Sequence, residues 1–195
     1  MTLRLTKKHN FDIVFDSQKV FRLILEAMSN PGTVVNICDC ADKLYGDNPV
    51  FLAVAITLLD NEVSFHACEN TSLSDEIASL TFAKKDPIES ADFIFAGTPR
   101  SAECAIENAK YGTLADPHKS ATVIVKNDGV PACLLTLTGP GIDGRTTIQT
   151  TQTAADAIAI RDALNYEYPE GIDLIFISSA GELFAIPRLT RMEVE

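Results

Sequence analysis

Residues 133–148, CLLTLTGPGIDGRTTI, predict a strand that ends in a glycine-rich turn. Apolar side chains occupy every second position at its start, from Cys133 to Leu137, which is the period of a half-buried strand. Gly139-Pro140-Gly141 then ends the strand, because glycine permits positive φ and proline fixes φ. A β-prone run, 145–150, follows. We therefore expect a loop of specific shape between two strands. It either lets something approach its backbone closely or turns the chain through a tight corner.

Gly139, Gly141 and Gly144 also match the G-x-G-x-x-G spacing of the dinucleotide fingerprint. That fingerprint needs its third glycine to open a helix whose N-terminus receives the pyrophosphate. Here the residues after Gly144 favour a strand, and Pro140 lies inside the loop. We interpret the match as a coincidence of a glycine-rich turn.

The 195-residue chain has the composition of a globular protein, with 46% hydrophobic and 22% charged residues. This length is most simply one domain over residues 1–195, with a substantial core. The formal net charge of -11 opposes binding to nucleic acid or to an anionic membrane. No export signal is visible, and the longest apolar run, 50–59, is too short to span a bilayer. We expect a cytoplasmic protein with reduced cysteines.

Hydrophobic periodicity predicts five helices, at 17–29, 50–59, about 74–82, 101–110 and 153–165. Runs rich in branched residues predict strands at 33–38, 62–67, 91–96, 120–126, 132–138, 172–178 and 183–186. Asp16 is the predicted N-cap of the first helix, with Phe15 and Val20 as a hydrophobic staple. Ser72 or Ser74 is expected to cap the third helix, and Thr153 the last.

Asn127-Asp128-Gly129 predicts a hairpin that joins strand 120–126 to strand 132–138. Other strands are separated by helices, which favours parallel pairing. Together these patterns predict an α/β fold, a three-layer sandwich with a mixed sheet between helical layers.

Two sets of residues are candidates for a metal site or a catalytic site. Cys38, Cys40, His66 and Cys68 offer four zinc ligands, but structural zinc sites usually draw on C-x-x-C turns. We favour buried cysteines and expect no metal. Asp116, His118 and Ser120 superficially resemble a catalytic triad. Triad members meet across a fold, however, whereas such close positions diverge. The sequence also lacks G-x-S-x-G, P-loop and H-E-x-x-H motifs, so we expect no catalytic residues.

Several segments of the chain, taken together, carry a family resemblance. They are FRLILEAMSNPG at 21–32, Leu59-Asp60, Pro117 with Ala121-Thr122, LTGPGI at 137–142, YPEGIDLI at 168–175, and IPR at 186–188. In this order they resemble the landmarks of the PhnH family, a subunit of the bacterial carbon–phosphorus lyase system. The chain departs from the pattern at His118, where many relatives carry an acidic residue, and at Leu189, where they carry threonine.

The resemblance implies a fold related to the large domain of PLP-dependent transferases, but without that cofactor. Lys84, Lys85, Lys110 and Lys126 lie in polar or turn-rich surroundings, which agrees with the lack of a Schiff-base lysine. The family resemblance also implies a homodimer that joins other carbon–phosphorus lyase subunits in a cytosolic transferase complex. That complex makes ribose 1-alkylphosphonate 5-triphosphate from ATP and an alkylphosphonate. Because the catalytic residues are thought to lie mainly in partners, this chain would be a non-catalytic or accessory subunit.

An alternative is a stand-alone protein that binds phosphate or phosphonate through Gly139, Gly141 and Arg188. A guanidinium suits bidentate contact with such oxygens, although in an acidic chain Arg188 more simply pairs with a carboxylate. We expect the glycine loop at the carboxyl end of its strand, where α/β sheets commonly place ligands. Arg188, expected to end the last strand, would reach that loop if the two strands are neighbours.

Overall fold

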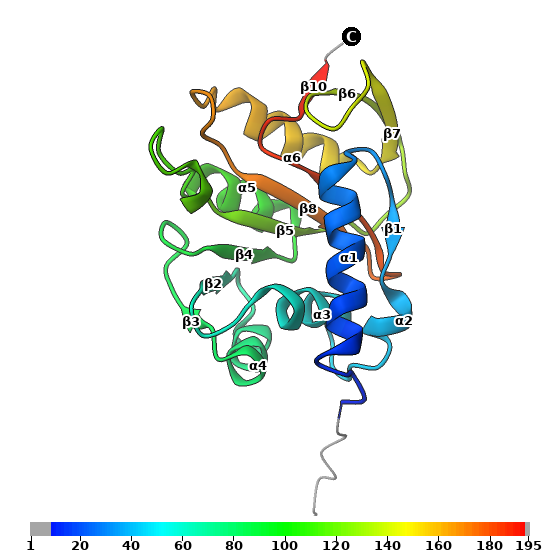
Figure 1. Ribbon diagram of the computed structural model, residues 1–195, viewed down its shortest axis with the longest axis vertical. Helices are drawn as coiled ribbons and strands as arrows, with labels where there is room; N and C mark the ends of the chain where they lie inside the picture. The colour runs from blue at the N-terminus through cyan, green and yellow to red at the C-terminus, as the bar shows by residue number, and fades with distance from the viewer. Residues whose placement is uncertain (1–8, 194–195) are drawn as a thin grey trace, which may run out of the picture.

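The computed structural model describes residues 9–193 and builds them around a seven-stranded mixed sheet (Figure 1). The strand order is β1-β9-β8-β5-β4-β2-β3. Strands β2, β3, β4, β5 and β8 pair in parallel, whereas β9 runs antiparallel to both of its neighbours. The bounds are β1 Val35–Asn36, β2 Ser64–Ala67, β3 Lys84–Lys85, β4 Phe93–Ala96, β5 Thr122–Lys126, β8 Asp173–Ile177 and β9 Glu182–Ile186.

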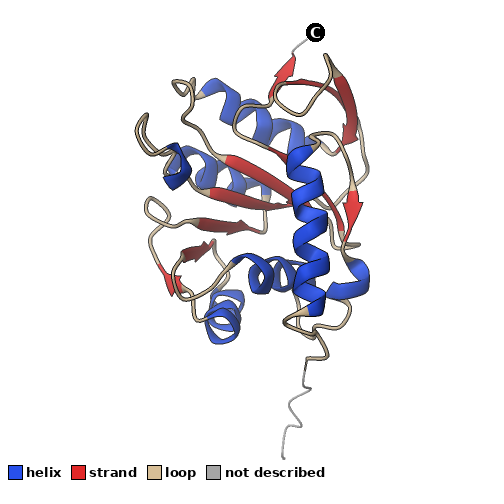
Figure 2. Ribbon diagram, in the orientation of Figure 1, coloured by secondary structure: helices blue, strands red, loops and turns tan. Residues whose placement is uncertain are grey.

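Helices cover both faces of this sheet, as Figure 2 shows. One face carries α1 Phe15–Ser29, α2 Cys38–Ala41, α3 Pro49–Leu58 and α4 Thr71–Thr81, and the other carries α5 Pro99–Asn108 and α6 Gln152–Ala163. Alternate residues of the central strands feed the two cores, with Ile124 in the first and Val123 in the second. The predicted α/β architecture with a mixed sheet between helical layers is confirmed.

The helical layer over the first core follows directly from the apolar pattern. Val20, Ile24 and Ala27 recur at helical spacing in α1, and all three are buried. Helix α3 is apolar on nearly every side, and its residues 50–55 are buried, as predicted. Within residues 9–193, none of the helices has both the length and the apolar character needed to cross a membrane.

The predicted helix caps were wrong where tertiary contacts use the side chains differently. Helix α1 begins before Asp16, because the Asp12 carboxylate accepts hydrogen bonds from the backbone N–H groups of Val14 and Phe15. Asp16 is instead buried, and its carboxylate accepts a 2.7 Å hydrogen bond from Lys43. The side chain of Phe15 is exposed, so the predicted staple with Val20 does not form.

Two further helices begin at caps other than those predicted. Helix α4 is capped by Asn70, whose side chain accepts from the N–H of Leu73, rather than by Ser72 or Ser74. Helix α6 is capped by Thr151, which accepts from the N–H of Ala154, and Thr153 lies inside the helix. In each case the true cap is the side chain that meets the free N–H groups of the first turn.

The predicted hairpin at residues 127–129 is also wrong. Strand β5 has parallel neighbours on both edges, β4 and β8, so no edge remains for the following strand. The chain instead crosses into a separate three-stranded sheet with the order β10-β6-β7, made of β10 Arg191–Glu193, β6 Cys133–Thr138 and β7 Thr146–Thr150. The strand–turn–strand reading of residues 133–148 is confirmed, since β6 and β7 pair from Cys133–Thr150 to Leu137–Thr146.

Candidate functional site

A hollow of about 520 Å³ lies beside the amino ends of β5 and β8. Its wall comes from the end of α1, the segment before β5, the loop after β6, the segment before β8, and the segment between β9 and β10. The lining residues are Met28, Ser29, Pro117, His118, Pro140, Gly141, Pro169, Asp173, Pro187, Arg188, Leu189 and Thr190. Five of the six stretches that resemble family landmarks therefore contribute to this hollow or directly border it.

Four prolines from four separate segments stiffen the wall: Pro117, Pro140, Pro169 and Pro187. Each proline ring fixes φ and replaces a backbone N–H with carbon. The surface that the hollow offers is consequently apolar and held in one shape. Such a preformed apolar pocket suits a bulky apolar group better than a strongly hydrated one.

Arg188 is the arginine in this wall, and it is engaged within the protein. Its Nη2 donates to Asp173 Oδ2 at 2.7 Å, its backbone N–H donates to Asp173 Oδ1 at 2.8 Å, and its Nη1 donates to the carbonyl of Pro117. The pairing with a carboxylate that we favoured is confirmed. Arg188 does not end a strand, however, because it lies between β9 and β10. It joins the starts of β8 and β5, since Asp173 opens β8 and Pro117 precedes β5.

The glycine loop approaches the protein's own backbone. Gly139 and Gly141 have φ of +138° and +84°. A Cβ at Gly141 would lie 2.4 Å from the carbonyl oxygen of Ser29, and one at Gly139 would lie 2.8 Å from that of Leu189. The loop therefore packs closely against both the end of α1 and the segment before β10. It follows the carboxyl end of β6, but it lies at the amino edge of the parallel strands, opposite to the edge at which such sheets commonly place ligands.

Arg161 positions this region, and sequence reasoning missed it. The guanidinium is fully buried and donates to the carbonyls of Ile186 at 3.1 Å, Pro187 at 3.1 Å and Thr190 at 2.5 Å. Burial lowers its pKa from the ordinary value, although Asp162 Oδ1 at 2.7 Å favours the charged form. The signal was present in the sequence, because Arg161 continues the stripe of Ala154 and Ile158 that faces the core.

Asp116, His118 and Ser120 do not form a hydrogen-bonded triad. His118 Nε2 lies 4.0 Å from Asp116 Oδ1, and its side chain is 73% exposed. The hydroxyl of Ser120 is buried without a hydrogen-bond partner among the described residues. His118 does line the hollow, but the arrangement supplies no base held against a nucleophile.

Two of the residues considered as zinc ligands lie on opposite faces of the large sheet. Cys40 belongs to the core on one face, and Cys68 belongs to the core on the other. Burial raises the pKa of the Cys68 thiol to about 11, so the thiolate that binds metal is disfavoured at neutral pH. Across residues 9–193, no three His, Cys, Asp or Glu side chains are grouped so that they could hold a metal ion.

At the carboxyl edge of the parallel strands, polar groups contact one another beside a pocket of about 200 Å³ that is lined in part by Asn127, Thr151 and Ser178. After β5, Asp128 accepts hydrogen bonds from the backbone N–H of Ser179 at 2.6 Å and from its hydroxyl at 2.8 Å. Although burial raises the pKa of Asp128, these bonds outweigh it and leave that pKa below the ordinary value. The first turns of α5 and α6 are capped by Thr98 and Thr151, and Thr151 also donates to the side chain of Asn127.

The sequence is similar to that of known proteins over almost its full length. A model of the family "Bacterial phosphonate metabolism protein (PhnH)" matches residues 9–193. The chain is 29% identical over 182 residues to the putative C-P lyase subunit protein HtxG of Stutzerimonas stutzeri, an alignment that covers 91% of this chain and 86% of that protein. It is 26% identical over 193 residues to the alpha-D-ribose 1-methylphosphonate 5-triphosphate synthase subunit PhnH of Rhizobium meliloti (strain 1021), covering 94% of each chain.

Proposed function

The chain belongs to the PhnH family of bacterial phosphonate metabolism proteins, and we propose that it is an accessory subunit of a C–P lyase complex. In this proposal the complex is a cytoplasmic transferase that makes ribose 1-alkylphosphonate 5-triphosphate from ATP and an alkylphosphonate during phosphonate catabolism. The chain itself performs no catalysis and forms a homodimer when it is isolated. Its role is to bind and position partner subunits.

The convergence of the landmark segments on one hollow is the observation that carries this proposal. The hollow is apolar and walled by proline, and Asp173 offsets the charge of its arginine. A pocket of this kind accepts the bulky side chain of a partner, since binding energy at protein interfaces concentrates where such anchors fill preformed pockets. The charge pair also favours a contact with protein over the binding of a free anion.

We further propose that the fold is related to the large domain of PLP-dependent transferases, without the cofactor. Three of the four lysines considered above are held in ion pairs: Lys85 with Asp75, Lys110 with Asp92 and Lys126 with Asp128. A Schiff-base lysine must instead present a neutral amine to a cofactor. The pairing supports a role for these lysines in stability.

Co-expression tests the accessory role. The tagged chain, produced with the other C–P lyase subunits of its host, should co-purify with them in fixed proportion. The isolated chain should form a dimer by light scattering and should not turn over methylphosphonate with ATP. Turnover by the isolated chain, or failure of the subunits to co-purify, would overturn the proposal.

A second candidate is a stand-alone protein that binds phosphate or phosphonate through Gly139, Gly141 and Arg188. It is favoured by the observation that Gly141 and Arg188 line the same hollow, with His118 at its wall. It ranks second because Arg188 is already paired with Asp173. Calorimetry of the isolated chain with methylphosphonate and with inorganic phosphate separates the two candidates. Saturable binding that is lost in Arg188→Gln would favour the anion site, whereas the subunit role predicts no such heat.

A further inference from the structure

Exposed apolar side chains gather on the outer side of α1. Across residues 9–193 the structure exposes thirteen large hydrophobic side chains, and five of them lie between residues 13 and 25. Val14 is 69% exposed, Phe21 49% and Leu25 52%. Isolated exposed hydrophobics are common on protein surfaces, but a cluster of this kind marks an interaction site.

The members of this cluster form a stripe that leads into the hollow. Val14, Phe21, Leu25 and Met28 are separated by seven, four and three positions, so they lie on one face of the helix. Met28, the last of them, lines the hollow described above. At 1.5 Å of rise per residue the stripe extends for about 21 Å, which is the length of four turns of a second helix. We call these four residues the α1 stripe.

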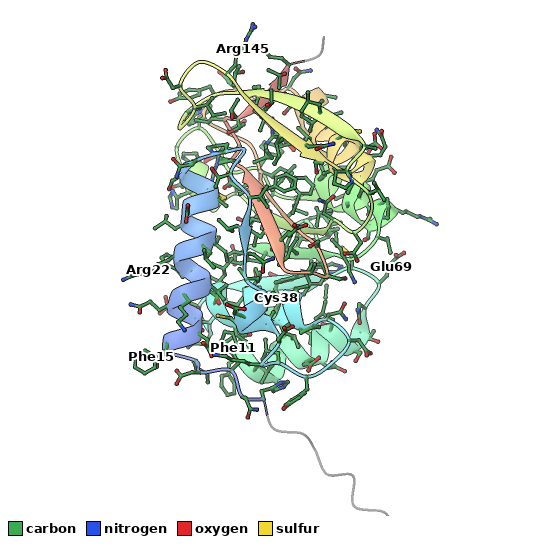
Figure 3. The ribbon with its side chains drawn as sticks, turned by 90° about the vertical axis from the view of Figure 1, so that its right-hand side faces the viewer. Phe11, Phe15, Arg22, Cys38, Glu69 and Arg145 are labelled. Atoms are coloured by element: carbon green, nitrogen blue, oxygen red, sulfur yellow. The ribbon has the colours of Figure 1, made fainter. Side chains whose placement is uncertain are left out.

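Arg22 places a positive charge beside the α1 stripe, although the chain has a net charge of -11 and the acidic Glu26 lies one turn further along the helix. Arg22 lies next to the stripe on the outer side of α1, as Figure 3 shows, and its side chain has no hydrogen-bond or ion-pair partner among the described residues. At the far end, Arg188 borders the hollow, but Asp173 in the same wall offsets its charge. A cation that has no internal partner is available to an external carboxylate.

We propose that the α1 stripe and the hollow bind one amphipathic helix of a partner subunit, whose apolar face is flanked by carboxylates. Its apolar side chains cover Phe21 and Leu25, a bulky side chain enters the hollow, and a carboxylate pairs with Arg22. This is the helix-in-groove mode of recognition. The inference rests on the proposed function, since it names the surface through which the subunit joins its complex.

The position of Arg22 disfavours a second copy of this chain as the occupant. Helix α1 spans Phe15–Ser29, so Arg22 is its middle residue. A two-fold axis through an antiparallel pair of α1 helices would bring Arg22 close to its own copy. Two Arg22 side chains that lie close together repel each other, whereas Arg22 attracts a carboxylate from a different chain.

Two synthetic peptides of about 20 residues test the proposal, because shorter isolated helices are marginally stable in water. Both carry the same apolar stripe with one tryptophan, but one is flanked by glutamate and the other by lysine. The protein has no tryptophan, so the emission of the peptide reports binding directly. The acidic peptide should bind at least tenfold more tightly than the basic peptide. This preference runs against the net charge of the protein, so unspecific attraction cannot produce it.

Variants define the surface. Phe21→Ser with Leu25→Ser should weaken binding of the acidic peptide at least tenfold, and Arg22→Glu should make the basic peptide the tighter ligand. Phe82→Ser is the matched control, because Phe82 is 77% exposed but lies after α4, and it should bind like the parent chain. Circular dichroism melts establish that each variant is folded.

The results that overturn the proposal are distinct from those that overturn the subunit role. The proposed docking surface would be overturned if both peptides bound equally well, if neither bound, or if Phe82→Ser weakened peptide binding as much as Phe21→Ser with Leu25→Ser. A parent dimer that Phe21→Ser with Leu25→Ser converts to a monomer would assign the α1 stripe to a second copy and would also overturn it. If the parent chain still co-purifies with its partner subunits in these cases, the proposed function stands and only this surface fails.

Discussion

The two ends of the parallel strands are built in opposite ways. At the carboxyl ends, where α/β sheets commonly bind ligands, the polar groups satisfy one another. Asp128 accepts two hydrogen bonds from Ser179, while Thr98 and Thr151 cap the helices that begin there. At the amino ends, a hollow of about 520 Å³ remains open.

The difference between the two edges shows how a parallel α/β sheet, a type that commonly binds small ligands, can be adapted to bind a partner protein. Helix N-termini attract anions because their first N–H groups lack partners, and here side-chain oxygens already occupy some of those groups. The larger hollow lies instead at the amino edge, where Arg188 is paired with Asp173 and the walls are apolar, whereas the pocket at the carboxyl edge measures about 200 Å³. We therefore expect the amino edge to depend on a few buried contacts, and the carboxyl edge on many small ones.

The largest effect is expected at the amino edge, from Arg161→Met. Removing the guanidinium leaves three carbonyls and Asp162 without their buried partner, which should lower the free energy of unfolding by about 3–5 kcal/mol. Urea denaturation followed by circular dichroism measures this loss. Arg191→Gln is the control, because that side chain is 41% exposed and should matter by about 1 kcal/mol or less. A loss of stability below that of the control would contradict the role given to the buried hydrogen bonds of Arg161.

The next effect comes from Gly141→Ala in the loop that closes the hollow. The alanine Cβ would lie 2.4 Å from the Ser29 carbonyl, and φ is +84°, so strain should lower stability by about 2–3 kcal/mol. Gly144→Ala is matched to it in the same loop, since φ is +75° but no atom lies within 4 Å of the new Cβ. It should lower stability by only about 1 kcal/mol. Equal thermal-unfolding losses would show that the close approach to Ser29 is unimportant.

At the carboxyl edge, Thr151→Ala should have a smaller effect. It removes the cap of α6 and the hydrogen bond to Asn127, and helix caps of this kind contribute about 1 kcal/mol. Thr153→Ala provides the comparison, because Thr153 lies within the first turn and caps nothing. Its unfolding midpoint should match that of the parent. If Thr153→Ala were the more damaging variant, the assignment of the cap would be reversed.

The smallest effect is expected from Asp92→Asn, which tests an ion pair before β4. Burial raises the pKa of Asp92, but hydrogen bonds from Lys110 and Ser64 outweigh it and hold that pKa below 3.8. The depressed pKa means that the carboxylate stabilises the fold above pH 3.8 and loses this effect as pH falls through the folded value. Because the side chain is 36% exposed, solvent screening limits the difference at neutral pH to roughly half a kcal/mol.

Unfolding measured across pH checks the sign of this effect. The gap between the parent and Asp92→Asn should be widest near neutral pH and should close in acid. Asp75→Asn serves as control, because its pair with Lys85 is exposed and should contribute little. A gap that widened in acid would contradict the assignment.

Apolar sequence patterns were sufficient to predict the elements that are buried on all sides. The run DLIFI of β8 and the run of α3 have a single reading, because burial on all sides needs no knowledge of a partner. We also expected Arg188 to end the last strand and to reach the glycine loop if the two strands were neighbours, and Arg188 instead lies between β9 and β10. Gly141 and Arg188 nevertheless line one hollow.

Features that depend on distant residues could not be read from local patterns. Asp16 has the sequence context of a cap, but Lys43, 27 positions later, determines its use. Asn127-Asp128-Gly129 has the composition of a hairpin, but the pairing of β5 with β8 leaves no free edge for one. Arg161 was hidden for the same reason, because the carbonyls that receive it come from the C-terminal part of the chain.

The position of β1 and α1 has a consequence for biosynthesis. The blue helix α1 crosses the orange-red C-terminal strands in Figure 1, and β1 pairs with β9 through Val35–Leu183 and Asn36–Glu182. The ribosome therefore releases α1 well before its strand partner exists. During that interval both the core side of α1 and its outer stripe are open to water, which invites aggregation. Chaperones that recognise short apolar segments should bind nascent chains at residues 13–28, and release should follow emergence of β9.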